Sequence, residues 1–574
     1  MFQKIDNLKT WQIAIILILV GFSVFFSGLS GGFQGDDTDQ IIKNTAVHSI
    51  SNIGLFFKSS TFWNGESLVG DFYRPTMTTT YSLVYTFFGA NPMAYHVVQL
   101  LIYIGCSLIL FLLLKRFFRP VIALLVSLIF LVHPINSQIV YSIPSMQEPL
   151  MLLFGLSAIY VLSRSQTTKS LITATLLLFL SLLSKETAIV FVCLALLYLF
   201  LYNKTRLFSF IKIVTLPVIL YILIRISVVG LRNITLSAPI DLLSFGQRML
   251  MVPSLIVFYI SKFFFPNNLS TSYYWTYQSP SFTGFVIPLL IVLACLGLVY
   301  LAGRLIYKKA GKKALTPFLF FAAWTALGLA PYMQIVALDM TACETWFVIA
   351  IIGLLGMLAI TLKTLMPRLR PVWLFTVGLM IIIGLGVRSE LRGLDYHNQA
   401  TLSLKDISIT DKNYLAMNNL AKYYIDNNQL QKAEGYAKLS IEYFPSVTNY
   451  NNLGVIQQKM NDFTGARQSY VKALNIMPLG VTYENIAITN FVVGVLNDNI
   501  AFLKKGLALY PNNGRLWTYL AIEEAAIGNN SEAKIAILNA YRLGPIPSAL
   551  YVAIINHTPL DVPILNSGTI VHIP

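Results

Sequence analysis

Long apolar segments recur along the first two thirds of the chain, and they limit its fold more than any other feature. Segments of this length and hydropathy are typical of bilayer-crossing helices, and they lie near residues 11–30, 93–114, 119–133, 148–163, 169–184, 187–202, 210–229, 284–302, 315–332, 345–361 and 371–388. Only 11% of the 574 residues are charged, whereas soluble domains average about 25%. The sequence therefore predicts an all-α fold, a polytopic membrane helix bundle with about 11 spans.

Basic residues cluster in every second connection between these segments. The clusters are Lys4 and Lys9; Lys115, Arg116 and Arg119; Arg164 and Lys169; Lys204, Arg206 and Lys212; Arg304, Lys308, Lys309, Lys312 and Lys313; and Lys363, Arg368 and Arg370. Because cytoplasmic loops are rich in lysine and arginine, the pattern predicts a cytoplasmic N-terminus and an extracytoplasmic location for everything after residue 388. The formal charge of +16 then reflects topology and anionic lipid. The lipid bilayer is a predicted partner, and nucleic acid is not.

Three apolar segments are treated separately. Counting 245–266 as a crossing would invert the later basic clusters, so it is predicted to be an interfacial helix or half of a re-entrant pair. Segment 76–90 is too short and polar to span and is predicted to lie along the outer interface. Segment 11–30 lacks an A-x-A site and exceeds a signal-peptide core, so an uncleaved first span is favoured over a cleaved signal.

The last third of the chain is repetitive. Prolines recur at spacings of 33, 33 and 34 residues, at Pro445, Pro478, Pro511 and Pro545. Each follows a Leu or Ile paired with a small residue at a matching offset, although the third copy is degenerate because Asn499 stands where a small residue is expected. This pattern resembles tetratricopeptide repeats, which stack into a solenoid with a concave protein-binding surface. The predicted domains are a membrane domain (1–390), a linker (391–411), the repeats (412–548) and a C-terminal tail (549–574).

Candidate chemistry lies in polar residues on the predicted outer face, because signatures of soluble enzymes such as GxxxxGK[ST], GxSxG and HExxH do not occur in the sequence. The four cysteines are scattered without CxxC spacing and imply neither a metal site nor a disulfide framework. Ionisable groups near bilayer depth are costly, so each needs a partner or a function. The outer face carries Asp36, Asp37, Asp39, Asp71, Arg74, His96, His133, Glu148, Lys185, Glu186 and Glu344.

Three sequence stretches carry a family resemblance: "FYRPTMTTTYSLVYTFFGANPMAYHVVQLLIY", "LVHPINSQIVYSIPSMQEPLMLLFGL" and "LSLLSKETAIV". Together they resemble the membrane domain of the transmembrane-and-tetratricopeptide-repeat O-mannosyltransferases, which have the C-type glycosyltransferase fold and use polyprenyl-phosphate sugars. The resemblance covers roughly residues 11–390. The matched elements are the acidic pair Asp36 and Asp37; Tyr73, Arg74 and Pro75; Gly89, Asn91, Pro92, Tyr95 and His96; His133 and Pro134; Ser184, Lys185 and Glu186; and Glu344.

The resemblance and the chemistry of glycosyl transfer imply the same roles. A carboxylate must take the proton of the acceptor hydroxyl or orient this weak nucleophile, a role that suits Asp36 or Asp37. Cations must stabilise the departing phosphate. Donor-phosphate binding is therefore predicted for Arg74, Lys185, His96 and His133, and supporting roles for Glu148, Glu186 and Glu344. A divalent cation (Mg²⁺ or Mn²⁺) stays open as a cofactor, because some relatives with this fold use one and others do not.

The predicted function is inverting transfer of a sugar, mannose by resemblance, from a polyprenyl-phosphate donor to a Ser or Thr hydroxyl of an exported protein held by the repeats. The chain departs from the family pattern at Gln138, Gln147 and Thr345. These departures keep a non-catalytic membrane scaffold as one alternative, and a transporter of lipid-linked precursors is another. A structure should place Asp36 or Asp37 within several ångströms of Arg74 or Lys185, around one cavity open to both the membrane and the exterior. Scattered positions would favour the scaffold.

Simpler explanations exist for each candidate. The aspartates could form a solvated loop, and Arg74 could extend to lipid headgroups. The histidines could make packing hydrogen bonds, and Lys185 with Glu186 could be a turn with a local ion pair.

Overall fold

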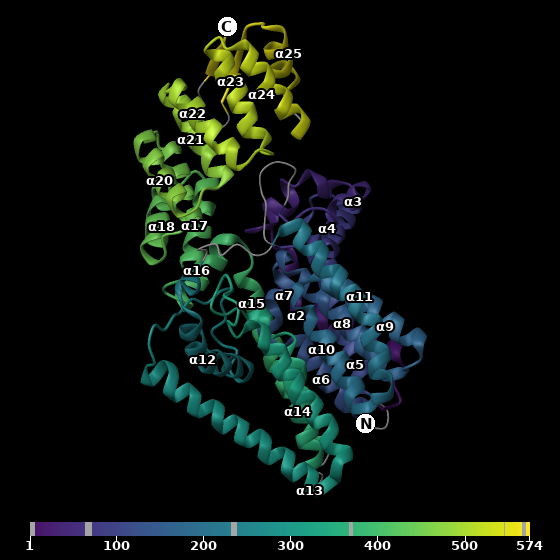
Figure 1. Cartoon of the computed structure of the whole chain (residues 1–574). Helices are drawn as coiled ribbons and strands as arrows, with labels where there is room; N and C mark the ends of the chain where they lie inside the picture. The colour runs from purple at the N-terminus through teal and green to yellow at the C-terminus, as the bar shows by residue number, and fades with distance from the viewer. Residues whose placement is uncertain (1–5, 63–71, 231–237, 367–370, 545, 565–569) are drawn as a thin grey trace.

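The computed structural model describes residues 6–62, 72–230, 238–366, 371–544, 546–564 and 570–574, and these are predominantly helical (Figure 1). The helices of the first part are α2 (Thr10–Phe25), α3 (Ile53–Phe56), α4 (Pro75–Phe88), α5 (Pro92–Leu114), α6 (Pro120–Val132), α7 (Ser137–Tyr141), α8 (Gln147–Arg164), α9 (Thr168–Ser184), α10 (Ile189–Tyr202), α11 (Lys204–Val229), α12 (Phe245–Phe264), α13 (Ile287–Leu329), α14 (Ala350–Leu365) and α15 (Pro371–Asp395). Short 3₁₀ or π turns are η1 (Ser27–Ser30), η2 (Thr38–Ile42), η3 (Thr45–His48), η4 (Ile50–Asn52), η5 (Pro134–Asn136), η6 (Ile143–Ser145), η7 (Glu186–Ala188), η8 (Pro239–Leu242), η9 (Phe282–Val286), η10 (Ala330–Tyr332) and η11 (Glu344–Phe347).

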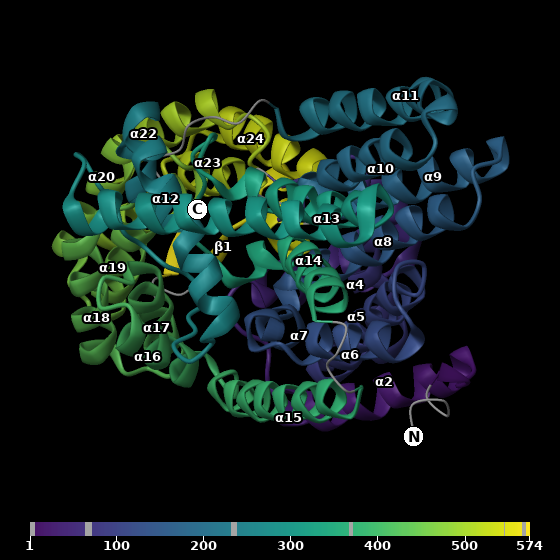
Figure 2. The same cartoon turned by 90° about the horizontal axis from the view of Figure 1, so that it is seen from below.

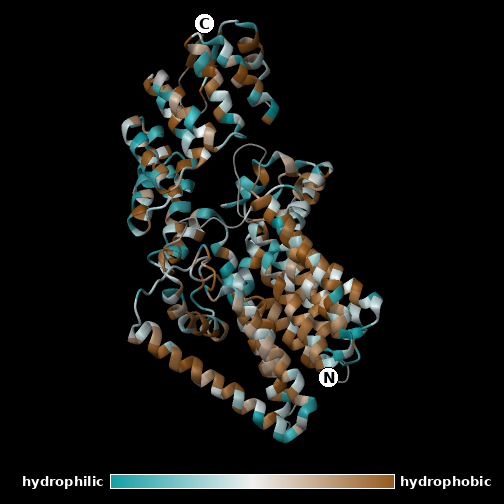
Figure 3. Ribbon diagram, viewed as in Figure 1, coloured by the Kyte–Doolittle hydropathy of each residue, from teal (hydrophilic) through white to brown (hydrophobic). Residues whose placement is uncertain are grey.

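Every predicted membrane span coincides with a helix, although the ends differ by a few residues. By length and composition, 5 helices of the described ranges can cross a bilayer, and 6 if the pair α6–α7, bent by 52°, counts as one span. The apolar helices at Thr10–Phe25, Thr168–Ser184, Glu186–Tyr202 and Ala350–Leu365 are shorter. Figure 3 shows apolar residues along the whole bundle and a mixed pattern in the repeats. The chain is therefore an integral membrane protein with the predicted all-α fold.

Helix α13 contains two predicted spans because the chain turns back inside it at Gly311, whose φ of +68° is accessible to glycine. Close to this bend the two legs pack together, since a Cβ on Gly303 would lie 3.2 Å from Phe318. Apolar side chains at Leu293 and Leu298 on the first leg are more than half exposed, at 54% and 66%. Such a surface suits lipid contact.

Helix α12 occupies the segment predicted to be interfacial or re-entrant. Ser244 caps its first turn, and Met251, Leu255, Tyr259 and Phe263 bury one face at intervals of four residues. It is not among the helices that are long and apolar enough to cross a membrane. The one-sided burial agrees with a helix that lies against the bundle.

Glycines let helices of the bundle approach closely. A Cβ on Gly155 would lie 2.4 Å from the Phe191 ring, and one on Gly356 would lie 2.3 Å from Phe321. Helix α15 runs beside α2, as both Figure 1 and Figure 2 show, and a Cβ on Gly386 would lie 3.1 Å from Val24. Small residues at such crossings are typical of helix packing in membranes.

The last third forms a stack of helix pairs. Its helices are α16 (Gln399–Ile409), α17 (Tyr414–Asp426), α18 (Leu430–Tyr443), α19 (Val447–Lys459), α20 (Phe463–Ile476), α21 (Gly480–Val493), α22 (Leu496–Leu509), α23 (Gly514–Ala526), α24 (Asn530–Leu543) and α25 (Ser548–Asn556). The pairs α17–α18, α19–α20, α21–α22 and α23–α24 correspond to the four predicted repeats, and the predicted solenoid is confirmed. Pro545, the last of the repeat prolines, lies outside the described residues.

The repeat signature has a packing explanation. Ala433, Ala466 and Ala533 are buried where the two helices of a pair meet, and a Cβ on Gly454 would lie 2.4 Å from the Tyr470 ring. In the degenerate copy, the buried Asn499 side chain is accommodated by hydrogen bonds. Its Nδ2 donates to the Ala487 carbonyl at 3.1 Å and to Glu523 at 2.8 Å. Because the polar group is fully partnered, it fits where alanine normally stands.

The segment predicted as a tail contains α25 and two antiparallel strands, β1 (Leu560–Pro563) and β2 (Ile570–Ile573), with Leu560 opposite Ile573. Val562, Val571 and Ile573 join the buried core of the last helix pair. These strands therefore cover the apolar end of the solenoid, which a stack of repeats otherwise leaves open.

Candidate active site

The acidic loop follows the first helix of the bundle. After η1, the chain turns at Gly35, which has φ +56°, and Asp36 and Asp37 follow before η2 begins. Asp37 accepts a hydrogen bond from the backbone N–H of Gln34 at 2.8 Å, and the Gln34 side chain donates to the Tyr396 carbonyl at 2.6 Å. These bonds fix the loop against the C-terminal end of α15.

The two aspartates of this loop differ in environment. Asp37 is 2% exposed, and burial raises its pKa well above the usual range, with the Gln34 N–H opposing the rise. The Asp36 side chain keeps access to solvent. Desolvation by the surrounding protein and then the neighbouring Asp39 raise its pKa, while Lys422 of α17 opposes the rise. Asp36 is therefore the accessible carboxylate of the pair.

Arg74 stands at the start of α4, where Pro75 fixes the first helical turn. Its Nη2 lies 3.2 Å from Glu186 Oε1, and its guanidinium lies 4.2 Å from the centre of the Phe72 ring. The Thr76 hydroxyl donates to the Ser184 hydroxyl at 2.9 Å. These contacts hold the start of α4 against the end of α9.

Lys185 ends α9 and forms an ion pair with Glu148 of α8. Both side chains are buried, with 6% and 1% exposed. The ammonium also donates to the Tyr332 hydroxyl at 3.4 Å. Burial favours the neutral amine, but Glu148 outweighs it and raises the pKa of Lys185 above its ordinary value. Lys185 is thus a fixed cation inside the protein.

These groups line one cavity of about 460 Å³. Its walls come from the acidic loop, the start of α4, the segment 138–148, residues 185–187, the segment 338–346 and the helices α16 and α17. Six of the predicted site residues line it: Asp36, Asp37, Arg74, Glu148, Lys185 and Glu186. The structure therefore brings residues that are far apart in the sequence to the wall of one cavity.

Several buried polar atoms on these walls have no hydrogen-bond partner among the described residues. They include Asp37 Oδ1, Arg74 Nε and Glu148 Oε2. Most buried polar groups in proteins are hydrogen-bonded to protein or ordered water, so each exception calls for an explanation. A polar ligand or water in the cavity could satisfy these atoms.

Three other predicted site residues do not line the cavity. His96 is buried in α5 beneath the acidic loop, where a Cβ on Gly31 would come within 3.4 Å of its Nε2. His133 is buried between α6 and η5; its Nε2 lies 3.0 Å from the Phe263 carbonyl oxygen, and its ring stacks on Phe263. Both histidines therefore pack helices and loops together.

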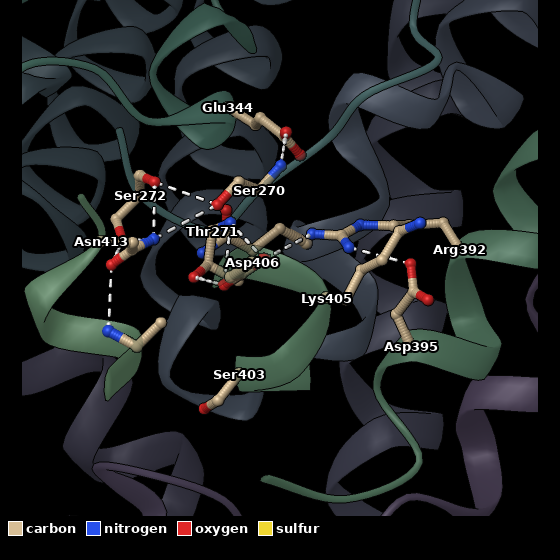
Figure 4. A network of polar contacts seen from close by, with 12 residues as sticks. Ser270, Thr271, Ser272, Glu344, Arg392, Asp395, Ser403, Lys405, Asp406 and Asn413 are labelled. Carbon is tan, nitrogen blue, oxygen red and sulfur yellow. Dashed lines mark hydrogen bonds and ion pairs between the residues drawn. The ribbon is translucent and has the colours of Figure 1, made fainter. Parts of the chain in front are cut away.

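Glu344, the third of these residues, belongs to a buried network between the bundle and the repeats (Figure 4). The Ser270 N–H and the Tyr273 hydroxyl both donate to its Oε1, at 2.6 and 2.8 Å. Burial raises the pKa of Glu344 to about 7, and Arg392 and the Tyr273 hydrogen bond oppose the rise. Through these contacts Glu344 helps to hold the junction between the bundle and the repeats together.

Arg392 and Asp406 of this network were not predicted from the sequence. Arg392 is fully buried, and its guanidinium lies 2.9 Å from Asp395 and 3.6 Å from Asp406. Asp406 also accepts a bond from the Thr271 N–H at 3.2 Å. Arg392 and Asp406 lie in the stretch that composition alone marks as a polar linker. A signal was available for Arg392, because it is a charged residue close after a predicted apolar span, where unpaired charges are costly.

Asn413 extends the same network into the repeats, because its Nδ2 donates to the Ser272 carbonyl at 3.1 Å (Figure 4). Beside it, the Tyr414 ring lies 4.5 Å from that of Tyr274. Leu415, Ala416 and Asn419 of α17 line the cavity. The first repeat is therefore part of the cavity wall.

The three positions that depart from the family pattern, Gln138, Gln147 and Thr345, all line the cavity. The Cys343 thiol lies 3.6 Å from the Gln138 side-chain oxygen and 3.3 Å from the Thr345 hydroxyl. These neutral side chains leave Arg74 and Lys185 as the basic groups among the described lining residues.

The side chains of the cavity do not by themselves supply a complete set of metal ligands. Across the described ranges, no group of three or more His, Cys, Asp and Glu side chains could hold a metal ion. Asp36 and Asp37 offer two carboxylates, fewer than the ligand number that Mg²⁺ or Mn²⁺ needs unless water or substrate oxygens complete it. A divalent cation bound here would therefore need oxygen ligands from water or substrate in addition to these carboxylates.

Comparison with known proteins relates the membrane domain to protein mannosyltransferases. Residues 75–231 match the family model described as dolichyl-phosphate-mannose-protein mannosyltransferase. The resemblance to transmembrane-and-tetratricopeptide-repeat O-mannosyltransferase-like proteins, predicted from the motifs, is confirmed over this part of the chain. The chain is similar to protein O-mannosyl-transferase F38B6.6 of Caenorhabditis elegans, with 32% identity over 30% of this chain and 26% of that protein. It is also similar to human protein O-mannosyl-transferase TMTC3, with 28% identity over 28% of this chain and 18% of that protein.

The matched region thus spans about a quarter or less of these relatives' length. Among solved structures, ArnT from Cupriavidus metallidurans bound to undecaprenyl phosphate aligns over 80% of this chain and 79% of that chain, with 13% identity and a TM-score of 0.35.

Proposed function

We propose that the protein is a membrane glycosyltransferase that moves a sugar from a polyprenyl-phosphate donor to a hydroxyl group of a polypeptide. The observation that carries the proposal is one cavity that is lined by Asp36, Asp37, Arg74 and Lys185 and also by the first repeat. The relatives named O-mannosyl-transferases support this class of reaction and make mannose the first sugar to test.

The reaction is a direct displacement at the anomeric carbon. The acceptor hydroxyl loses its proton to a carboxylate as its oxygen bonds to that carbon, and the bond between the carbon and the phosphate oxygen breaks. The sugar inverts its configuration, and the polyprenyl phosphate leaves with the bonding electrons. Competition from water is reduced when the bound donor and acceptor fill the cavity.

Asp36 is the proposed proton acceptor. It faces the cavity and keeps access to solvent, and its raised pKa brings it closer to the working pH, which suits a general base. Asp37 is buried, burial raises its pKa, and its carboxyl group accepts the Gln34 N–H bond, so its proposed role is to support the loop that carries Asp36.

Arg74 and Lys185 are the proposed phosphate ligands. Each is held by one carboxylate, Glu186 or Glu148, which fixes its position but leaves donors unused. The Arg74 Nε–H has no partner among the described residues. A leaving phosphate gains charge as the reaction proceeds, so cations fixed in advance stabilise the transition state.

The acceptor approaches from the repeats. Leu415, Ala416 and Asn419 of the first repeat line the cavity, so a polypeptide held on the solenoid has a short path to Asp36. This arrangement fits a Ser or Thr hydroxyl on an exported protein. It also fits the topology proposed from the basic clusters, with a cytoplasmic N-terminus and the repeats outside.

The test is transfer by the purified full-length protein in lipid nanodiscs. Labelled polyprenyl-phosphate mannose and other polyprenyl-phosphate sugars are offered with Ser- and Thr-containing polypeptides, and labelled polypeptide and free polyprenyl phosphate are measured. We expect Asp36→Asn to lower the rate by about 10²-fold or more, the usual contribution of a general base. The control is Asp39→Asn, which removes a nearby carboxylate that does not line the cavity. Because Asp39 raises the pKa of Asp36, this variant should shift the pH dependence of transfer without abolishing it. Equal activity of the wild type and Asp36→Asn, or no transfer from any donor, would refute the proposal.

A further inference from the structure

A second cavity, of about 1330 Å³, lies far from the first. It is bounded by the connection after α5, by α10, by the bend of α13 and by the end of α14. Figure 1 shows the α13 bend at the bottom of the bundle, at the opposite end from the repeats. The proposed transfer reaction makes no use of this cavity.

The charged residues of the described lining are all basic: Arg116, Lys309, Lys313 and Lys363. Lys309 donates to the Leu365 carbonyl at 3.1 Å and Lys363 to the Phe117 carbonyl at 3.3 Å. These bonds hold two ammonium groups at the cavity while leaving further donors on each. Within the described ranges, the side chains of Arg116 and Lys313 make no hydrogen bond or ion pair.

The remaining walls are aromatic and aliphatic. The Tyr202 ring lies 4.7 Å from that of Tyr198 and 6.3 Å from that of Phe117. Next to the basic residues, the apolar side chains of Leu319 and Leu362 are exposed on α13 and α14, at 48% and 42%. These groups suit a lipid at a membrane interface. The cations and the tyrosine rings lie where a headgroup would bind, and the adjoining apolar surface is available to the acyl chains.

From this arrangement we infer that the cavity binds the phosphate headgroup of an anionic phospholipid of the bilayer. Basic pockets between membrane helices are suited to such headgroups, because each lysine or arginine near the membrane surface adds to the attraction. The volume exceeds the 300–1,000 Å³ typical of small-molecule sites, as expected if the glycerol and the start of the acyl chains also enter. The acyl chains continue over the exposed leucines into the bilayer.

The sequence offers a matched control for this site. Lys309 and Lys313 line the cavity, whereas Lys308 and Lys312, their immediate neighbours on the same bend, do not. A double substitution of either pair removes the same charge from the same segment. A difference between the two pairs therefore reports the cavity itself and not the general basic character of this end.

The experiment is native mass spectrometry of the full-length protein titrated with phosphatidylglycerol or phosphatidylcholine. We expect tighter binding of phosphatidylglycerol, weakened about 25-fold by Lys309→Gln with Lys313→Gln, or about fivefold for each charge. Lys308→Gln with Lys312→Gln should leave the tight site in place. Arg116→Gln with Lys313→Gln provides a second variant if the loss of the Lys309–Leu365 bond unfolds the bend.

Three results would overturn the inference. An equal loss of phosphatidylglycerol affinity in the two double variants would indicate that the general basic charge of this end binds the lipid. Equal binding of phosphatidylcholine and phosphatidylglycerol would show that the headgroup charge does not determine binding. Displacement of the lipid by millimolar inorganic phosphate would assign the cavity to a free anion.

Discussion

Substitution of Lys185 by methionine tests whether the cation of the cavity and its partner act as one buried unit. The change removes the ion pair to Glu148 and the bond to the Tyr332 hydroxyl. Glu148 is 1% exposed, and its Oε2 already has no partner among the described residues. Breaking a buried pair by removing one partner costs about 3–5 kcal/mol, because an uncompensated charge is left behind.

The double substitution Lys185→Met with Glu148→Gln removes both charges. It should return most of that free energy, because a neutral pair of similar volume carries no large desolvation cost. The assay is thermal unfolding of the purified protein in one detergent. At about 2 °C per kcal/mol, the single variant should melt about 6–10 °C below the wild type, and the double variant should lie close to it.

The control for this prediction is an exposed pair. Lys438 pairs with Glu434 at 2.7 Å on the repeat surface with 61% of its side chain exposed, and Lys438→Met should cost less than about 1 kcal/mol. The reasoning is refuted if Lys185→Met is no less stable than Lys438→Met, or if the double variant is as unstable as the single one.

Three further predictions concern the junction and the repeats. Burial raises the pKa of Glu344 to about 7, so the folded state keeps a proton that the unfolded state loses, and the wild type should lose about 3 kcal/mol of stability as the pH rises from about 4.5 to 7. Glu344→Gln should remove this slope, and parallel pH profiles of melting temperature for the two proteins would contradict the assignment. Arg392→Leu leaves the buried Asp406 without its cation and should lower the melting temperature, whereas Arg392→Leu with Asp406→Asn should restore most of it; equal stability of Arg392→Leu and the wild type would show that the network contributes nothing. Gly454→Ala would place a Cβ 2.4 Å from the Tyr470 ring and should cost about 1–3 kcal/mol, whereas Gly435→Ala, with open space around it in α18, should stabilise by about 0.5–1 kcal/mol; circular-dichroism melts that rank the two variants in the opposite order would refute this packing account.

The sequence predicted the helix positions well because hydropathy alone sets them. Apolar segments long enough to approach a bilayer thickness must be helical, since a backbone in lipid has to satisfy its own hydrogen bonds. The bend of α13 was also encoded, by Gly311 between two pairs of lysines. The repeats were predicted because small residues must stand where the helices of a pair touch.

The cavity was foreseen only in part. Topology placed Asp36, Arg74 and Lys185 on one side of the membrane, and the structure brings them to one cavity. The sequence did not reveal that Glu148 and Glu186 would each pair with a cation, because those pairs depend on how α4, α8 and α9 pack.

The histidines and the junction show what sequence reasoning misses. His133 stacks on Phe263, a partner 130 residues away, so its packing role depends on a contact that no local pattern contains. Likewise Thr271, Arg392 and Asp406 come from three segments that meet only in the folded chain. Composition described the stretch between the bundle and the repeats as a linker, whereas α15 and α16 fill much of it.

The central claim is that the cavity beside the first repeat binds a lipid-linked sugar between its carboxylates and its cations. An experimental structure of the full-length protein in nanodiscs with a non-hydrolysable polyprenyl-phosphate sugar tests it most directly. We predict that the phosphate lies within hydrogen-bonding distance of Arg74 and Lys185, with the anomeric carbon facing Asp36. A donor bound elsewhere, for example in the basic cavity at the α13 bend, or a sugar turned away from both aspartates, would contradict the account.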